Sequence, residues 1–96
     1  MARVELSAAA AEDLERLIRT HSLPADTKKR VKRSLQPLRR FPLLGAALEG
    51  RWSSFRFVLG PWRWLVIVYV YLEADERVVV VTIQDGRSAH APSASR

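Results

Sequence analysis

The chain has 96 residues, enough for one domain, because domains commonly use about 100 to 150 residues to close around a single core. Its 48% hydrophobic and 27% charged residues are typical of a globular protein and argue against wholesale disorder. It contains no cysteine, and its two histidines, His21 and His90, lie far apart in the sequence. These counts exclude a disulfide scaffold, a thiolate zinc site and a cysteine nucleophile, and we expect neither a metal nor a cofactor.

The longest apolar run covers residues 64–72, far short of the roughly 20 residues that a membrane-spanning helix needs. We therefore expect this run to be a strand and the protein to have no membrane partner. The first residues, Met-Ala-Arg-Val-Glu-Leu, lack an apolar signal segment, so the expected location is cytoplasmic.

Charge is distributed unevenly along the chain. Sixteen Lys and Arg against ten Asp and Glu give a net charge of +6, which favours polyanions or an acidic protein as partners. The segment 27–48 has no acidic residue and contains most of the candidate nucleic-acid-binding side chains, namely Lys28, Lys29, Lys32, Arg33, Arg39 and Arg40. The plainer alternative is that these cations form only the solvated face of a helix.

The N-terminal half predicts a short strand and two helices. Alternating side chains over residues 3–6 indicate a strand with one buried face. Ser7 can cap a helix that runs to about Thr20, with an inward stripe of Ala10, Leu14, Leu17 and Ile18. A second helix opens at Pro24 or Asp26 and has an apolar stripe of Val31, Leu35 and Leu38. The two helices should form a hairpin, and Pro37 should kink or end the second one near Gln36.

The C-terminal half predicts a sheet. After a loop over residues 43–50, with Ala46, Ala47 and Leu48 tucked beneath it, alternation over 52–59 indicates a half-buried strand. Residues 62–72 predict a central strand covered on both faces, and residues 78–83 predict its partner. Helices followed by a three-stranded antiparallel meander define an α+β fold. The domain should span residues 1–83, with 84–96 a polar, mobile tail.

This order of elements resembles the RelE/ParE superfamily of toxins from type II toxin-antitoxin modules. The resemblance rests on Val4-Glu5-Leu6-Ser7 before the first helix, Phe41-Pro42, Leu48-Glu49-Gly50, and Phe55-Arg56 followed by Gly60-Pro61-Trp62-Arg63. It implies a small α+β toxin that is made with an antitoxin and attacks either ribosome-bound mRNA or DNA gyrase.

Carried over by position, Arg63 matches the arginine that follows the glycine turn in the family, and Arg56 matches a basic position on the preceding strand. Cationic side chains there would stabilise the charge that builds on a phosphate during metal-independent RNA cleavage. The structural alternative for Arg63 is stacking on Trp62 or Trp64. Arg87 and His90 are further candidates, for phosphate binding and for proton transfer. His21 is interpreted as structural or idle.

The sequence departs from the ribonuclease members in two ways. All lysines lie between residues 28 and 32, and no tyrosine follows Tyr71. Two functional hypotheses follow from the resemblance: cleavage of ribosome-bound mRNA, which we rank first, and non-enzymatic inhibition of DNA gyrase, the activity of the ParE type. A degenerate toxin that acts only as an interaction module is a third. Both toxin hypotheses predict an acidic, amphipathic antitoxin that pairs with the basic helix or a sheet edge.

Overall fold

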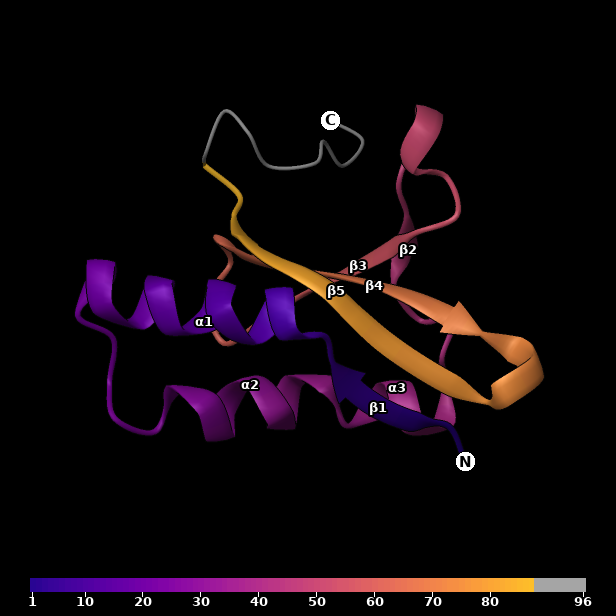
Figure 1. The fold of residues 1–96 in the computed structure, drawn as a ribbon, viewed down its shortest axis with the longest axis horizontal. Coiled ribbons are helices and arrows are strands. Elements are labelled where there is room, and N and C mark those ends of the chain that lie inside the picture. Colours follow the sequence, from indigo (N-terminus) through magenta and orange to yellow (C-terminus); the bar gives the residue numbers. More distant parts are fainter. Residues whose placement is uncertain (88–96) are drawn as a thin grey trace.

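The computed structural model describes residues 1–87, which form one mixed sheet with all the helices on one of its faces (Figure 1). The helices are α1 (Ala8–His21), α2 (Thr27–Leu35) and α3 (Pro37–Arg40). The strands are β1 (Arg3–Leu6), β2 (Ala46–Ala47), β3 (Arg56–Leu59), β4 (Leu65–Leu72) and β5 (Arg77–Asp85). Short 3-10 turns cover Gly50–Trp52 and Glu73–Asp75. The predicted α+β fold class is confirmed. None of the helices within residues 1–87 has the length and apolar character that a membrane span needs.

The helix boundaries follow the signals in the sequence. The backbone N–H of Ala10 donates to the Ser7 hydroxyl oxygen at 3.0 Å, so Ser7 caps α1 as predicted. Pro37 divides the second helix into α2 and α3, because proline has no backbone N–H to donate to the carbonyl oxygen four residues earlier. Figure 1 shows α1 and α2 running antiparallel, which confirms the helical hairpin.

The sheet has the strand order β1-β5-β4-β3-β2. The antiparallel meander of β3, β4 and β5 is confirmed, and β1 adds to it in parallel beside β5, with Val4 opposite Val78. One edge of the sheet is therefore β1, because β5 fills its other side. The sequence indicated β1 as a strand without indicating its partner, since the two lie more than 70 residues apart.

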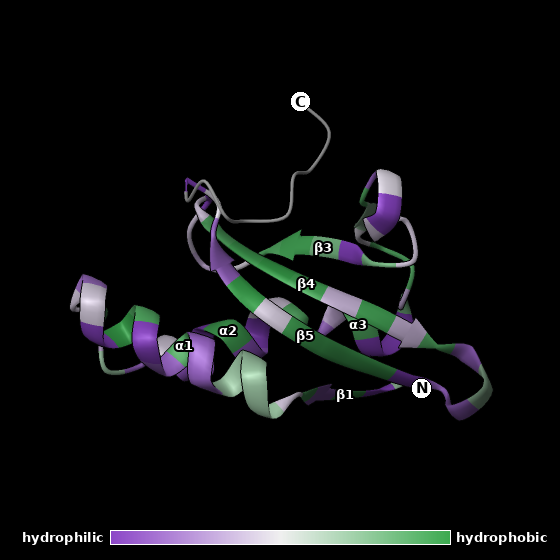
Figure 2. Cartoon of the chain, turned by 45° about the horizontal axis from the view of Figure 1, so that its top comes forward, coloured by the Kyte–Doolittle hydropathy of each residue, from purple (hydrophilic) through white to green (hydrophobic). Residues whose placement is uncertain are grey.

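The core lies between the helices and one face of the sheet. Side chains from every layer are almost fully buried, including Ala10, Leu14, Val31, Leu35, Leu38, Leu65, Ile67, Tyr69, Val78, Val80 and Ile83. Figure 2 shows β4 as a mainly hydrophobic band through the middle of the sheet, with hydrophilic residues on the outward side of α1. On the other face of β4, Val66 and Val70 are only half-buried but Val68 between them is fully buried. The predicted cover on both faces of this strand is therefore complete on the helical face and partial on the other.

Other sequence predictions need correction. The loop expected over 43–50 contains β2, and Ala46 and Ala47 are exposed, although Leu48 is buried as expected. The strand expected over 52–59 begins only at Arg56, because Gly50 has a positive φ of 64° and starts a 3-10 turn. At the other end, β5 continues to Asp85, two residues past the predicted domain boundary, because Leu65 and Val66 pair with it there.

A carboxylate joins α1 to β5. Asp13 accepts hydrogen bonds from the Thr82 hydroxyl at 2.7 Å and the Ile83 backbone N–H at 3.1 Å. Burial acts to raise the pKa of the Asp13 carboxyl, but these bonds and Arg16 outweigh it, so the pKa lies below its usual value. The contact falls past the end of β1, where β5 has lost its parallel partner, and it fixes α1 against that unpaired edge of the strand.

Candidate functional site

Arg56, predicted to hold RNA from the sheet, faces the helical side. It stands opposite Tyr69 in the register of β3 and β4, and opposed residues share a face. Its guanidinium donates to the carbonyl oxygens of Gly45 at 2.8 Å and Leu43 at 3.3 Å. Arg56 therefore holds the chain between α3 and β2 in place.

Tyr69 holds the same segment between α3 and β2 from the core. Its hydroxyl donates to the Pro42 carbonyl oxygen at 2.8 Å and accepts from the Gly45 backbone N–H at 2.9 Å, and its side chain is fully buried. Burial raises the pKa of the Tyr69 hydroxyl, more than the hydrogen bond from Gly45 lowers it. A Cβ at Gly45 would lie 2.5 Å from the Phe57 carbonyl oxygen, so only glycine fits this close approach. This role of Tyr69 was not predicted from the sequence, in which a hydroxyl group inside an apolar run was the available signal.

Arg63 is exposed at the turn between β3 and β4, between two tryptophans. The Trp62 and Trp64 rings stack with centroids 5.9 Å apart and planes 12° from parallel. Arg30 of α2 lies over Trp62 at 5.8 Å, and Arg87 lies over Trp64 at 4.9 Å. The predicted stacking partners are thus occupied by other arginines, and Arg63 forms no ion pair within residues 1–87.

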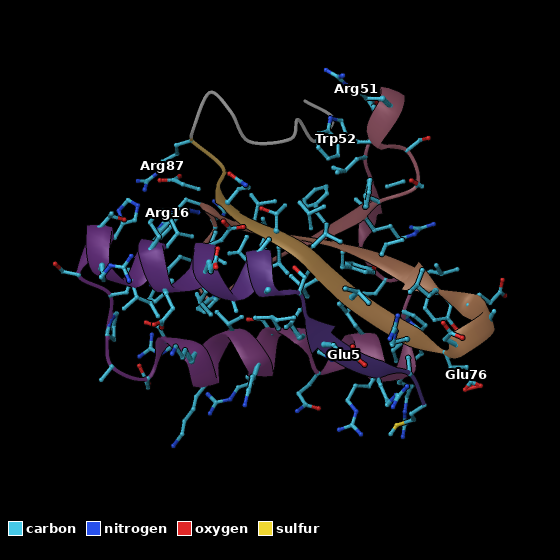
Figure 3. The ribbon with its side chains drawn as sticks, in the orientation of Figure 1. Glu5, Arg16, Arg51, Trp52, Glu76 and Arg87 are labelled. Atoms are coloured by element: carbon cyan, nitrogen blue, oxygen red, sulfur yellow. The ribbon has the colours of Figure 1, made fainter. Side chains whose placement is uncertain are left out.

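Arg87 is held by its own strand end. Two guanidinium nitrogens donate to the Asp85 carboxylate, each at 2.9 Å, and Figure 3 shows Arg87 projecting from the end of β5 on the α1 side. This hydrogen bonding, with a smaller contribution from His21, lowers the pKa of Asp85 to about 2. His21 Nε2 lies 3.5 Å from Asp85 and its ring packs 4.9 Å from Trp64, which gives this residue a structural place in the fold.

The predicted catalytic residues are therefore only partly brought together. Arg63 and Arg87 both adjoin Trp64, whereas Arg56 lies on the helix-covered face and binds the loop that β3 pairs with. His90 lies outside the described residues.

The predicted nucleic-acid-binding residues form an exposed basic surface on α2 and α3. We use this name for Lys28, Lys29, Lys32, Arg33, Arg39 and Arg40, all of which are exposed. Lys28 pairs with Glu15 of α1 at 2.6 Å. The other five form no ion pair within residues 1–87, so most of this charge faces solvent.

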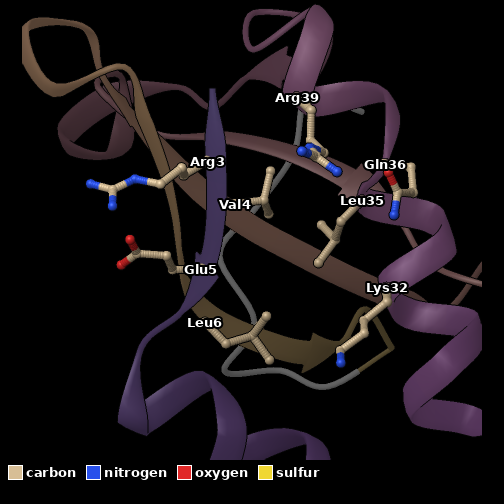
Figure 4. A pocket seen from close by; sticks show the side chains of 8 residues that line it. All are labelled: Arg3, Val4, Glu5, Leu6, Lys32, Leu35, Gln36 and Arg39. Carbon is tan, nitrogen blue, oxygen red and sulfur yellow. The ribbon is translucent and has the colours of Figure 1, made fainter. Parts of the chain in front are cut away.

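A groove runs beside this surface, between β1 and the helices α2 and α3. Figure 4 shows Val4, Leu6 and Leu35 pointing into it, with Lys32, Gln36 and Arg39 along the helical side. Its volume is about 570 Å³. We call it the β1 groove; an apolar floor, a cationic rim and an edge strand are the features that an extended or helical peptide with acidic side chains recognises.

The fold and this arrangement define a small α+β toxin of the RelE/ParE superfamily. A family model described as the ParE toxin of the type II toxin-antitoxin system, parDE, matches residues 4–90, and the chain belongs to this family. None of the curated proteins matches the chain significantly.

Solved structures share the fold at low sequence identity. The chromosomal ParDE toxin-antitoxin system from P. aeruginosa is similar at a TM-score of 0.66 and 13% identity, covering 88% of this chain and 96% of that one. The isolated E. coli RelE toxin gives a TM-score of 0.65 at 11% identity, over 94% and 89% of the two chains. The conserved hypothetical protein HP0892 from Helicobacter pylori gives 0.61 at 18%, over 88% and 94%.

Proposed function

We propose that this toxin arrests growth by binding DNA gyrase, without cutting a bond itself. The observation that carries the proposal is the position of Arg56. The arginine that would have to grip RNA from β3 instead faces the helical side and donates to the Gly45 and Leu43 carbonyl oxygens. The ParE family match supports the same choice, because the resemblance assigns gyrase to the ParE type.

The test is a supercoiling assay with purified gyrase, relaxed plasmid and the full chain. The expected result is inhibition at a roughly stoichiometric ratio of toxin to gyrase, since the mechanism is binding rather than turnover. The same assay with Arg63→Ala tests whether this exposed side chain contacts gyrase, since inhibition of supercoiling should weaken only if it does. Unimpaired supercoiling at a large excess of the wild-type chain would refute the proposal.

Cleavage of ribosome-bound mRNA is the second candidate. It is favoured by the exposed Arg63, which stands with Arg87 beside the stacked tryptophans at the end of the sheet. Primer extension on mRNA from induced cells would then show codon-phased 3' ends, and Arg63→Ala would abolish them. A degenerate toxin would leave supercoiling and mRNA unaffected in these two assays, and its expression without a partner would leave growth unchanged.

The proposed partner that neutralises the toxin is an acidic, amphipathic antitoxin. The β1 groove offers it apolar contacts through Val4, Leu6 and Leu35, and the adjoining basic surface offers it positive charge. Complementary charge of this kind accelerates association and opposes pairing between two copies of the basic chain. Association that weakens steeply as salt rises would support this partner, and salt-independent association would count against it.

A further inference from the structure

The segment between α3 and β2 has the reverse of the usual loop arrangement. Its backbone polar groups point into the protein, whereas its large apolar side chains face solvent. Phe41, Leu43 and Leu44 are 59%, 57% and 58% exposed. We call residues 41–44 the apolar turn.

The backbone of the apolar turn is fixed at several points. The Leu44 N–H donates to the Phe41 carbonyl oxygen at 3.0 Å, which closes a β-turn with Pro42 at its second position. The Phe41 N–H donates back to the carbonyl oxygen of Pro37 at 2.9 Å. The Pro42 carbonyl oxygen accepts from Tyr69 and the Leu43 carbonyl oxygen from Arg56, as described above. The exposed side chains therefore stand on a rigid support, which limits the entropy lost when a partner covers them.

The charge around the turn indicates what kind of partner fits it. Arg39 and Arg40 immediately precede it, are exposed and form no ion pair within residues 1–87. Glu49 is the only acidic residue between Asp26 and Glu73 in the sequence. A second copy of this chain would bring like charges together, whereas an apolar stripe flanked by acids would meet both the leucines and the arginines.

The turn also continues the β1 groove. Arg39 lines that groove and lies two residues before Phe41. The Ala2 N–H donates to the Arg39 carbonyl oxygen at 2.8 Å, which ties the start of β1 to the helix that leads into the turn. A single partner segment can thus pass from the groove onto the turn without leaving cationic surface.

We propose that the apolar turn is a docking site for an acidic amphipathic helix of the antitoxin, whose apolar stripe covers Phe41, Leu43 and Leu44 while its carboxylates pair with Arg39 and Arg40. This inference rests on the proposed toxin function. It assigns to the antitoxin a surface separate from the Trp62–Trp64 end of the sheet.

The test uses the full chain and the product of the adjacent reading frame as the antitoxin probe, with affinity measured by calorimetry. The variant is Leu43→Ser combined with Leu44→Ser. Its matched control is Leu59→Ser, because Leu59 is 45% exposed but lies on β3 away from the turn. All these side chains are exposed, so circular dichroism should show the wild-type fold in each variant.

The double variant should lose about tenfold or more in antitoxin affinity, as truncation of anchor side chains at an interface does, while the control changes by less than about twofold. Growth arrest by the double variant expressed alone should equal that of the wild type, and co-expressed antitoxin should no longer rescue growth. Arg40→Glu should also lower the affinity for the antitoxin, and it should reduce the salt dependence of binding.

Three results would overturn the inference. The first is unchanged antitoxin affinity of the double variant. The second is loss of growth arrest with antitoxin binding intact, which would assign the turn to the toxin's target. The third is a dimer in sedimentation that the double variant dissociates, which would assign the turn to self-association. Failure of the gyrase proposal would look different. The wild-type chain would then leave supercoiling untouched, but the antitoxin would still bind it more tightly than it binds the double variant.

Discussion

Replacing Tyr69 with phenylalanine removes one oxygen that bridges two backbone groups of the loop between α3 and β2. The ring and its packing stay in place, because the substitution deletes only the hydroxyl. The Pro42 carbonyl oxygen then loses its donor at 2.8 Å, and the Gly45 N–H loses its acceptor at 2.9 Å. Both partners lie at a fully buried side chain, so water does not readily replace the hydroxyl.

The magnitude follows from the cost of an unpaired buried polar group, which is about 1 to 3 kcal/mol each. Since Arg56 still holds the Gly45 carbonyl and the loop can relax toward solvent, we expect a total near the lower end, about 2 to 3 kcal/mol. For a chain of this size, that loss corresponds to a fall in Tm of roughly 8 to 24 °C.

Urea unfolding followed by circular dichroism measures the free energy, and hydrogen exchange at the Gly45 amide measures the local effect. Tyr71→Phe is the matched control, because Tyr71 lies on the same strand and packs against the same core, with no hydrogen bond from its hydroxyl within residues 1–87. The control should change stability by less than about 0.5 kcal/mol. Equal stabilities of the two variants, with unchanged exchange at Gly45, would refute the role assigned to the Tyr69 hydroxyl.

Three further changes test other parts of the fold. Asp13→Asn should cost about 1 to 2 kcal/mol in urea unfolding, because an amide accepts the paired bonds of the carboxylate less well; a neutral effect would mean that α1 is held by packing alone. The pKa of Asp85 is lowered in the folded protein, so its stabilisation is present above pH 3.8 and is lost as the pH falls toward about 2. Asp85→Asn should flatten that part of the stability profile, by no more than about 1 kcal/mol because the arginine of the pair is largely exposed to solvent; an unchanged slope would argue against the ion pair with Arg87. Leu38→Ala should cost about 2 to 5 kcal/mol because Leu38 is fully buried, whereas Leu59→Ala should cost far less; similar losses in thermal melts would contradict the assigned core.

Local chemistry made much of the fold readable in the sequence. Ser7 could be predicted as a cap and Pro37 as a helix boundary because both act on backbone groups within four residues of themselves. The meander could be predicted because consecutive strands with short connections pair with each other. The exposure of the basic surface likewise followed from charges grouped on the face of α2 opposite its apolar stripe.

The tertiary structure decided which side chains serve the fold and which remain available to a partner. Arg56 and Arg63 are both arginines beside strand residues, but only the register of β3 on β4 turns Arg56 toward the loop carbonyls and leaves Arg63 at an exposed turn. Tyr69 bonds to residues more than 20 positions away in the sequence. Likewise, β1 pairs in parallel with a strand more than 70 positions away. Such contacts depend on chain closure over long separations, which alternation and capping signals do not encode, whereas the charge and the order of elements were already determined along the chain.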